Sequence, residues 1–366
     1  MRIGIDGRYI QDHFPGIGRY TYNLVKGLAS ATPGTDFTVI YNPALSNTRY
    51  DMVALSRLEN VELVRADIST FSPAEQWLLP RLLRRLRLDV FHSPYYLRPY
   101  LLPCPAVVSI YDVIPLLYGQ YMPSLWAVAV WLTVRTAAKV ITLSESARGD
   151  LMRHFHIPPQ RIAAIPAAAD ERFKPLGKEE VASFCRKYGL APGYVLYLGI
   201  NKPHKNLARL VEAFARLGGD RRLVLAGRED RRYKEARRAV EKYGLGGRVI
   251  FFGDVPDEDL PALYNGAVCF VLPSLYEGFG LPVLEAMACG LPVICAHTSS
   301  LPEVAGEAAL LVDPLDVEAL AEALSRVLSD QDLRAEMRAK SLARAAEFSW
   351  PETARRTLAV YREAVG

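Results

Sequence analysis

Residues 271–290 read VLPSLYEGFGLPVLEAMACG, and this stretch decides the fold. Its first residues end an apolar run typical of a buried strand, and Gly278 and Gly280 follow in a loop. A helix is predicted to begin near Leu281, because proline suits the first positions of a helix and Gly290 suits the residue after its end. A strand, a glycine loop and a helix N-terminus in succession predict an anion site, since free N–H groups and the helix dipole favour negative charge there.

Two glutamates frame this predicted site. Glu277 lies in the loop and Glu285 lies near the end of the first helical turn, with seven residues between them. A carboxylate does not favour a phosphate, but it accepts hydrogen bonds from neutral sugar hydroxyls. The spacing therefore predicts one glutamate on a ribose and one on a second sugar. The alternative is a capping carboxylate and an ordinary surface glutamate.

Short apolar runs alternate with amphipathic stretches along the whole chain, which predicts parallel sheets covered by helices on both faces. The fold class is therefore α/β, with two Rossmann-like, doubly wound domains that bind ligands at the carboxyl edges of their sheets. The predicted strands are Ile3–Ile5, Phe37–Tyr41, Val61–Val64, Asp89–His92, Val107–Tyr111, Val140–Leu143, Tyr194–Leu198, Leu223–Ala226, Val249–Phe252, Val268–Leu272, Pro292–Cys295 and Leu310–Val312.

The length of 366 residues exceeds what one hydrophobic core usually supports. Prolines punctuate the stretch from Pro166 to Pro192, where we expect the break between the halves. We therefore predict a first domain over residues 1–172, a second over 173–348, and a closing helix over 349–366 that returns to the first domain.

The charge, the cysteines and the apolar stretches of the sequence exclude some classes of function. A net charge of +4 is too small for a dedicated nucleic-acid binder, so no nucleic-acid partner is predicted. Five cysteines without a CxxC pair fit a reduced, cytoplasmic chain with buried thiols. The first residues do not have the pattern of a signal peptide. The longest apolar stretch, Leu125–Leu132, is far shorter than the ~20 residues of a membrane span.

Four segments carry a resemblance to a known family. The string EGFGLPVLE resembles the E-x7-E signature of the family 4 retaining glycosyltransferases with the GT-B fold. Residues 199–206 (GINKPHKN), 249–255 (VIFFGDV) and 349–361 (SWPETARRTLAVY) are similar to further segments of that family. The resemblance is specific in the C-terminal half and weaker in the N-terminal half. It implies the transfer of a hexose from a nucleotide sugar, GDP-mannose or a UDP-hexose, to a saccharide or lipid-linked acceptor in glycan synthesis.

The resemblance also implies roles for single residues. It places the donor diphosphate on Lys205, and Lys202 shares that role because His204 stands where many relatives carry arginine. The implied catalytic residues are Glu277, Lys205 and Asp112. The implied donor-binding residues are Gly16, Gly18, Lys202, Asn206, Val255, Gly278, Phe279, Gly280, Leu281 and Glu285.

The acceptor is expected at strand ends of the first domain. Tyr111, Arg19 and His92 are the predicted acceptor contacts, and Tyr111 stands where relatives usually carry histidine. The alternatives are a turn residue for Asp112 and a structural role for His92. No two histidines have metal-ligand spacing and no D-x-D pair follows a strand, so we predict that neither a metal nor another cofactor is required.

Residues 76–88, QWLLPRLLRRLRL, have leucines on one helical face and arginines largely elsewhere. This pattern fits a helix that packs on the sheet. It also fits a basic, Trp-bearing helix at the surface of an anionic membrane, which would place the protein at the inner face of that membrane.

No Asp or Glu stands out as a nucleophile backed by a base, as a double displacement would require. Front-face substitution, in which the leaving phosphate takes the acceptor proton, is the mechanism that the resemblance implies. The alternatives are a nucleotide-sugar epimerase, a sugar phosphorylase and a non-catalytic subunit of a glycan-synthesis complex.

Overall fold

The computed structural model describes residues 1–32, 34–119 and 123–366. The chain divides into two compact units. The first joins Met1–Ala167 to Ser349–Gly366, and the second is Ala168–Phe348. The first unit therefore ends at Ala167, next to Pro166, whereas the sequence placed its end at residue 172.

The first unit is built on a seven-stranded parallel sheet with the strand order β3-β2-β1-β4-β5-β6-β7. Strand β7 was not predicted, because three residues between prolines are too few to show a periodic pattern. The strands are β1 (Arg2–Asp6), β2 (Asp36–Tyr41), β3 (Val61–Arg65), β4 (Val90–Ser93), β5 (Ala106–Ser109), β6 (Lys139–Thr142) and β7 (Ile162–Ala164).

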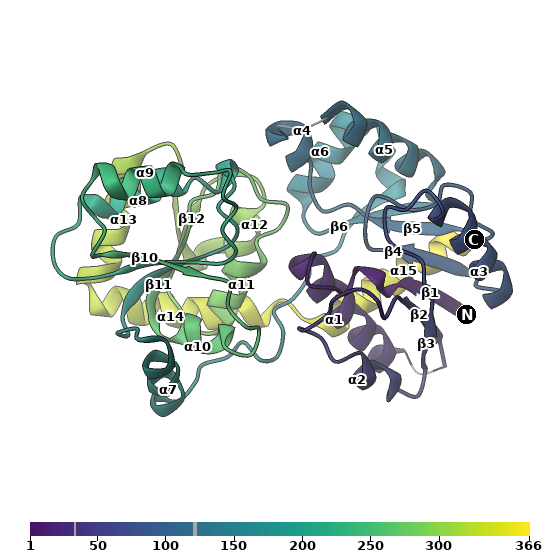
Figure 1. Ribbon diagram of the computed structural model, residues 1–366, viewed down its shortest axis with the longest axis horizontal. Coiled ribbons are helices and arrows are strands. Elements are labelled where there is room, and N and C mark those ends of the chain that lie inside the picture. Colours follow the sequence, from purple (N-terminus) through teal and green to yellow (C-terminus); the bar gives the residue numbers. More distant parts are fainter. Residues whose placement is uncertain (33, 120–122) are drawn as a thin grey trace. The chain divides into compact units, whose positions relative to one another are not determined.

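Helices cover both faces of this sheet: α1 and α15 lie on one face and α5 and α6 on the other (Figure 1). The α-helices of the unit are α1 (Pro15–Ala31), α2 (Met52–Ser56), α3 (Glu75–Leu86), α4 (Ile114–Tyr118), α5 (Pro123–Thr136), α6 (Glu145–Phe155) and α15 (Trp350–Val365), and its 3-10 turns are η1 (Gly7–Tyr9) and η2 (Pro159–Arg161).

The second unit is built on a six-stranded parallel sheet with the order β10-β9-β8-β11-β12-β13. In both sheets the strand order reverses beside the first strand of the unit, and ligands of open α/β sheets bind at such a switch point. The strands are β8 (Tyr194–Leu198), β9 (Leu223–Ala226), β10 (Val249–Gly253), β11 (Ala267–Leu272), β12 (Val293–Ala296) and β13 (Ala309–Val312).

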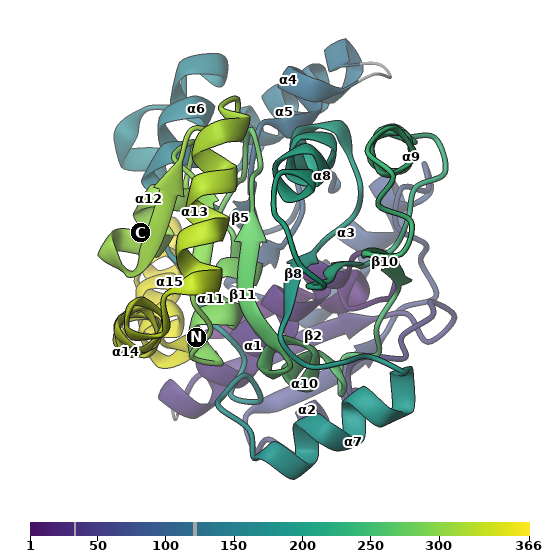
Figure 2. The same cartoon turned by 90° about the vertical axis from the view of Figure 1, so that its left-hand side faces the viewer.

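Helices α8, α9 and α13 cover one face of the second sheet, and α10, α11 and α14 cover the other (Figures 1 and 2). The α-helices are α7 (Lys178–Tyr188), α8 (Leu207–Ala215), α9 (Glu235–Lys242), α10 (Leu260–Asn265), α11 (Leu281–Ala288), α12 (Leu301–Ala305), α13 (Val317–Ser329) and α14 (Gln331–Ala346), with 3-10 turns η3 (Pro203–Lys205) and η4 (Gly306–Ala308).

The closing helix α15 belongs to the first unit. It begins at the cap Ser349, whose side chain accepts a hydrogen bond from the backbone N–H of Glu352. It packs along α1 at Gly27, where a Cβ atom would lie 2.9 Å from the carbonyl oxygen of Trp350. The chain therefore returns to its first unit after completing the second.

Helix α3 packs on the sheet through one face only. Leu79 and Leu83 are buried in a cluster with residues of β2 and β4. Trp77 and Leu78, in contrast, are 65% and 43% exposed. Leu88 is also buried in this cluster, and Leu82 and Leu86 pack against it, so the packing explanation for residues 76–88 accounts for every leucine of the segment except Leu78 and leaves Trp77 and Leu78 unexplained.

Among the residues that the structure describes, no helix has both the length and the apolar character that a bilayer crossing demands.

Candidate functional site

The loop between β11 and α11 carries Glu277 and brings it against Lys205, so two of the three residues to which the sequence gave catalytic roles lie together. Lys205, at the end of η3, donates from Nζ to Oε1 of Glu277 over 2.6 Å. The hydroxyl of Ser274 donates to the same oxygen over 2.6 Å. Both charged side chains are largely buried, at 18% and 10% exposure. A buried, hydrogen-bonded ion pair fixes the orientation of both groups, because either charge alone would be costly there.

The loop that carries Glu277 is held by two serines that precede α12. The backbone N–H of Glu277 donates to the hydroxyl of Ser299 over 2.8 Å. The hydroxyl of Ser300 lies 2.9 and 2.8 Å from the carbonyl oxygens of Glu277 and Phe279. These bonds satisfy backbone groups in an irregular loop and leave little freedom for the carboxylate of Glu277.

Helix α11 begins directly after this loop. Its cap, Gly280, has φ +110°, a conformation that L side chains rarely adopt, and a Cβ atom there would lie 2.8 Å from a methyl group of Leu301. Glycine is therefore required for the turn that aims the first amides of α11, at Leu281 and beyond, toward a ligand. Phe279 is buried and packs edge-on against Phe348, so its ring supports the loop.

Glu285 lies one turn into α11 and is only 1% exposed. The hydroxyl of Tyr264 in α10 donates to its Oε2 over 2.9 Å. The buried tyrosine thus orients the second glutamate of the signature from within the core. Its role on a ribose stays a prediction.

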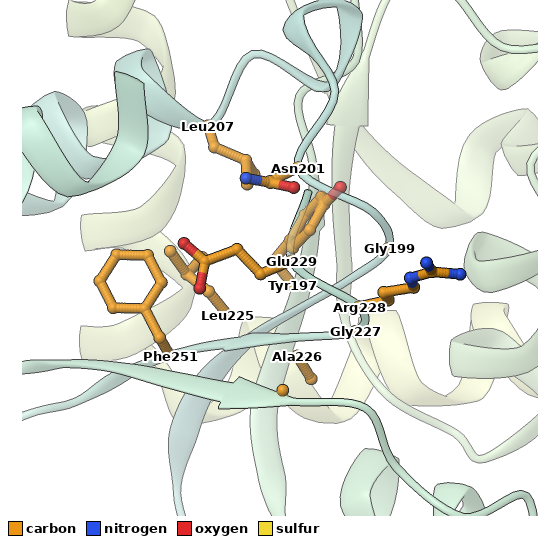
Figure 3. Close-up of a pocket in the computed structure, with 11 residues that line it drawn as sticks. Tyr197, Gly199, Asn201, Leu207, Leu225, Ala226, Gly227, Arg228, Glu229 and Phe251 are labelled. Carbon is orange, nitrogen blue, oxygen red and sulfur yellow. The ribbon is translucent and has the colours of Figure 1, made fainter. Parts of the chain in front are cut away.

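A pocket opens at the carboxyl ends of β8, β9 and β10, within the second unit (Figure 3). One glycine follows or ends each strand: Gly199, Gly227 and Gly253, with φ values of +156°, +112° and +78°. The three backbones lie in contact, since a Cβ atom at Gly227 would lie 2.6 Å from the carbonyl oxygen of Gly199. A Cβ atom at Gly199 would lie 2.7 Å from the hydroxyl of Tyr197, so neither Gly199 nor Gly227 has room for a side chain, whereas Gly253 has open space beside it. The remaining lining residues are Tyr197, Asn201, Leu207, Leu225, Ala226, Arg228, Glu229 and Phe251.

Hydrogen bonds fix the pocket walls. The amide nitrogen of Asn201 donates to the carbonyl oxygens of Asp230 and Tyr233 over 3.1 and 2.8 Å. Arg237 forms a two-pronged pair with Glu229 at 2.5 and 2.6 Å and covers the ring of Phe251 at 4.1 Å. In the sequence, Gly199 stood out only as the first residue of the segment 199–206, without a role of its own, and neither Gly227 nor Glu229 was singled out. The sequence does place one glycine at the end of each of three successive strands. Only the strand order shows that these three glycines lie side by side and form one floor.

Other residues of the predicted donor set have different places. The side chain of Asn206 is buried and donates to the carbonyl oxygens of Pro273 and Pro314 over 3.1 and 2.6 Å. It therefore positions the loop, and its donor-binding role stays a prediction. Lys202 is exposed beside the site, and the buried side chain of Val255 lies two residues beyond the pocket glycine of β10.

His204 has no direct role at the site. It is buried, and burial together with the charges of Lys205 and Lys202 lowers its pKa to about 3. Its backbone carbonyl accepts a hydrogen bond from the N–H of Leu275, which ties η3 to the catalytic loop.

The two glycines of α1 that were predicted to bind the donor, Gly16 and Gly18, have different surroundings. Gly16 is exposed, with no atom within 4 Å of a built Cβ. Gly18 is buried, and a Cβ there would meet the Tyr50 ring at 3.1 Å and the carbonyl oxygen of Tyr9 at 3.3 Å. Gly18 therefore permits close packing of α1, and its predicted donor role stays a prediction. Arg19 is half-buried on the same helix.

His92 lies in the core of the first unit. It is 0% exposed, and its ring nitrogens lie 2.6 Å from the hydroxyl of Tyr361 and 2.9 Å from that of Ser109. Burial lowers its pKa to about 3, so the ring is neutral. We therefore assign His92 to the attachment of α15 and not to acceptor binding.

Tyr111 and Asp112 follow β5, which ends two residues earlier than predicted, at Ser109. The hydroxyl of Tyr111 donates to the carbonyl oxygen of Pro94 over 2.9 Å, and burial raises its pKa well above the usual value. Asp112 accepts a hydrogen bond from the N–H of Ile114 over 2.9 Å, as a turn residue does. Its side chain is only half-buried and stays a candidate acceptor contact.

No group of three or more His, Cys, Asp or Glu side chains in the described ranges is arranged to hold a metal ion.

Comparison with known proteins agrees with this geometry. The family model "Glycosyl transferases group 1" matches residues 187–344, and the model "Glycosyltransferase Family 4" matches residues 15–173. O-antigen chain mannosyltransferase B of Escherichia coli is 33% identical over 99% of this chain and 100% of its own length. The serotype-specific mannosyltransferase WbdA of Escherichia coli is 35% identical over 60% of this chain and 28% of its own length.

Solved structures share the fold. Sucrose-phosphate synthase from Thermosynechococcus elongatus superimposes with a TM-score of 0.78 at 21% identity, over 99% of this chain and 98% of that one. HepE of Anabaena, in complex with UDP and glucose, gives 0.77 at 19% identity, over 98% of each chain. With two doubly wound sheets, the paired glutamate signature and a relative matched along its full length, this chain belongs to the group 1 glycosyltransferases of family 4 and is a glycosyltransferase with the GT-B fold.

Proposed function

We propose that this chain is a retaining, metal-independent mannosyltransferase. It transfers mannose from a nucleotide-diphosphate donor, GDP-mannose, to a hydroxyl group of a growing saccharide. The observation that carries the proposal is the ion pair between Lys205 and Glu277 beside the N-terminus of α11. The choice of mannose rests on the mannosyltransferase relatives, one of which matches along its full length.

The pair explains how charge is managed during transfer. In the structure, the ammonium group of Lys205 is balanced by Glu277. A bound diphosphate offers the lysine a stronger anionic partner, and Glu277 is then available to accept a hydrogen bond from a hydroxyl of the donor sugar. Negative charge grows on the diphosphate as the glycosidic bond breaks. The lysine and the first amides of α11 stabilise that charge, so no metal ion is needed for it.

The reaction keeps the anomeric configuration through substitution on one face of the sugar. The bond between the anomeric carbon and the diphosphate oxygen breaks, and the acceptor oxygen bonds to the same carbon. The acceptor proton passes to the leaving diphosphate. Glu277 is poorly placed as a nucleophile, because Lys205 and Ser274 already hold its Oε1.

The pocket at the ends of β8, β9 and β10 is the proposed site of the nucleoside. Its glycine floor admits a planar base, and Glu229, held by Arg237, offers a carboxylate to ring N–H or amino groups. Guanine presents such donors on one edge, which is why we favour GDP-mannose over other nucleotide sugars.

Thermal unfolding with a panel of GDP-mannose, UDP-glucose and ADP-glucose tests the donor. A ligand at about 100 times its Kd stabilises the folded state by about 2.7 kcal/mol. We expect a shift of several degrees with GDP-mannose and a smaller one with the others. Transfer in the presence of EDTA, with the anomeric configuration of the product read by NMR, tests the mechanism. Inverted product or loss of activity in EDTA would contradict the proposal. Incubation with donor alone separates transfer from epimerisation.

We also propose that the outer face of α3 rests on an anionic membrane surface. Trp77 and Leu78 are exposed there, and the neighbouring loop adds Leu101, which is 85% exposed. The backbone N–H of Tyr100 donates to the side chain of Gln76, which joins that loop to the helix. Four exposed arginines surround these residues, and within the described residues none of them forms an ion pair: Arg81, Arg84, Arg85 and Arg87.

Sedimentation with phosphatidylglycerol vesicles tests this surface. Each basic residue near an anionic bilayer contributes about 1 kcal/mol. Arg84→Glu with Arg85→Glu should therefore weaken binding by more than about tenfold. Lys234→Glu with Arg238→Glu, on α9 of the other unit, is the charge-matched control and should bind as the wild type does. Equal loss in both variants would show that net charge alone is responsible.

A further inference from the structure

Four aromatic rings of the first unit form a compact cluster. Tyr9, Phe14, Phe71 and Tyr95 all contact one another, with ring centroids between 5.0 and 6.3 Å apart. They come from four different segments of the chain. Tyr9 follows β1, Phe14 precedes α1, Phe71 precedes α3 and Tyr95 follows β4. None of these residues was singled out from the sequence.

The floor of this aromatic cluster is rigid. Tyr9 is 0% exposed, and its hydroxyl donates to the carbonyl oxygen of Leu97 over 3.0 Å. Beside it, the buried Arg8 donates to Asp6 and to Glu75, each over 2.6 Å. Burial against Asp6 and Glu75 also raises the pKa of Tyr9, so its hydroxyl stays protonated. The cluster thus rests on a fully paired charge network.

The same network fixes the most exposed ring. The second oxygen of Glu75 accepts a hydrogen bond from the backbone N–H of Phe71 over 3.2 Å. Phe71 has φ +66°, a conformation that residues other than Gly, Asn and Asp seldom adopt. Its side chain is 45% exposed. Strained backbone held by buried groups around an exposed aromatic ring is typical of a binding site and not of a packing defect.

The cluster continues into a row through the half-buried Tyr95 and Tyr96 to the buried Trp126. The ring of Tyr95 lies 4.2 Å from that of Tyr96, which lies 5.7 Å from that of Trp126. Asp112 is close to both tyrosines. Burial and, to a smaller extent, the charge of Asp112 raise the pKa of Tyr96. A carboxylate thus stands beside a row of ring faces.

The position of the row points to a ligand. Tyr9, Tyr95 and Asp112 follow β1, β4 and β5, three neighbouring parallel strands, so they lie at the carboxyl edge of the sheet. Ligands of open α/β sheets bind at this edge. A saccharide fits it, because the C–H face of a sugar ring packs on the negative face of an aromatic ring while its hydroxyls donate to a carboxylate. An aliphatic chain has no hydroxyl to donate to the carboxylate of Asp112, and an anionic headgroup would be repelled by its charge.

We propose that Phe14, Phe71, Tyr95 and Tyr96 form the platform on which the acceptor saccharide stacks, with Asp112 as its hydrogen-bond acceptor. This inference rests on the proposed function and adds to it the residues that select the acceptor. The row of rings spans more than one sugar, so the platform binds an oligosaccharide in preference to a monosaccharide.

Titration with α-linked mannotriose, followed by saturation-transfer NMR, tests the platform. Phe71→Ala should weaken binding roughly five- to tenfold, the range that one aromatic contact supplies. Trp131→Ala is the matched control, since this ring on α5 is also 45% exposed, and it should bind as the wild type does. Phe71→Tyr should retain binding. If Phe71→Ala does not fold, Phe14→Leu keeps apolar volume, removes a ring face and should show the same weakening.

Two outcomes overturn the platform: no mannotriose binding to the wild type, or equal affinity in Phe71→Ala and Trp131→Ala. A second readout separates this failure from failure of the proposed function. Hydrolysis of the nucleotide sugar by water does not need the acceptor, so hydrolysis by the wild type reports on the proposed function alone, whereas the KM for mannotriose should rise in Phe71→Ala and stay at the wild-type value in Trp131→Ala. If the wild type neither binds nor hydrolyses a nucleotide sugar, the proposed function fails, and the mannotriose titration still decides the platform.

Discussion

The carboxyl edges of the two sheets expose different kinds of chemical groups. In the second unit the edge consists of backbone and charge: three glycines with positive φ form the pocket floor, and Lys205 and Glu277 stand beside a helix N-terminus. In the first unit the edge consists of side-chain surfaces: a cluster of aromatic rings lies on a buried ion network. A nucleotide diphosphate is recognised by amides and charges, and a sugar chain by flat apolar faces. The comparison shows that the sequence of a two-substrate enzyme reveals a site built from backbone and charge more readily than a surface built from side chains.

Replacing the lysine of the second edge should have the largest effect. Lys205→Ala removes the cation that stabilises the leaving diphosphate and leaves Glu277 unpaired in a largely buried position. We expect kcat to fall by about a hundredfold or more. Lys202→Ala is the control, because this lysine is exposed beside the site, and kcat should fall by less than about tenfold. Equal losses would show that general positive charge and not the ion pair matters.

The glycines of the two edges should respond differently to the same change. Gly280→Ala forces an L residue to φ +110° and into contact with Leu301, which should cost about 1–3 kcal/mol in stability and weaken nucleotide-sugar binding. Gly16→Ala in α1 meets open space and should leave both unchanged or slightly improved. Thermal unfolding with and without GDP-mannose measures both effects. A loss of donor affinity in Gly16→Ala would support the predicted donor-binding role of Gly16.

The sequence predicted the second edge well because backbone-built sites leave local marks. Gly280 and Gly290 stand at the ends of α11, where their positive φ values require glycine, and the strands Tyr194–Leu198 and Leu223–Ala226 have the predicted bounds. These features depend on neighbours within a few residues. The pocket floor could not be predicted, because Gly199, Gly227 and Gly253 become neighbours only through strand order.

The first edge was poorly predicted for a related reason. His92 and Gly18 follow the first strands at positions typical of a site, yet both are buried by packing with distant residues such as Tyr361 and Tyr50. Phe71 lies in a loop without any motif. Its role depends on Glu75 and Tyr95, and no spacing in the sequence announces such a contact.

The two buried histidines, one in each unit, should make stability depend on pH. Burial holds the pKa of His92 and of His204 at about 3, below the unfolded value of 6.5. Between these values the unfolded chain binds more protons, so stability rises with pH and is lost as pH falls from about 6.5 towards 3. Each histidine contributes a slope of about 1.4 kcal/mol per pH unit. His92→Gln should reduce the dependence of Tm on pH in this range. An unchanged dependence would show that His92 is already protonated in the folded chain.

Tyr111→Phe should have the smallest effect, and it tests whether the first edge uses this residue chemically. The resemblance placed a histidine here, and a titratable group would act on the acceptor hydroxyl. In the structure the hydroxyl of Tyr111 instead donates to Pro94, and its ring packs against Tyr20. Removing the hydroxyl leaves one buried carbonyl unpaired, which costs about 1 kcal/mol in stability, and should change kcat by less than about twofold. If kcat fell tenfold at unchanged Tm, the hydroxyl would contact the acceptor, and the first edge would be a chemical site as well as a binding surface. If only Tm falls, the hydroxyl of Tyr111 has no chemical role, and the aromatic rings act on the acceptor by shape alone. The acceptor proton must then pass to the donor phosphate.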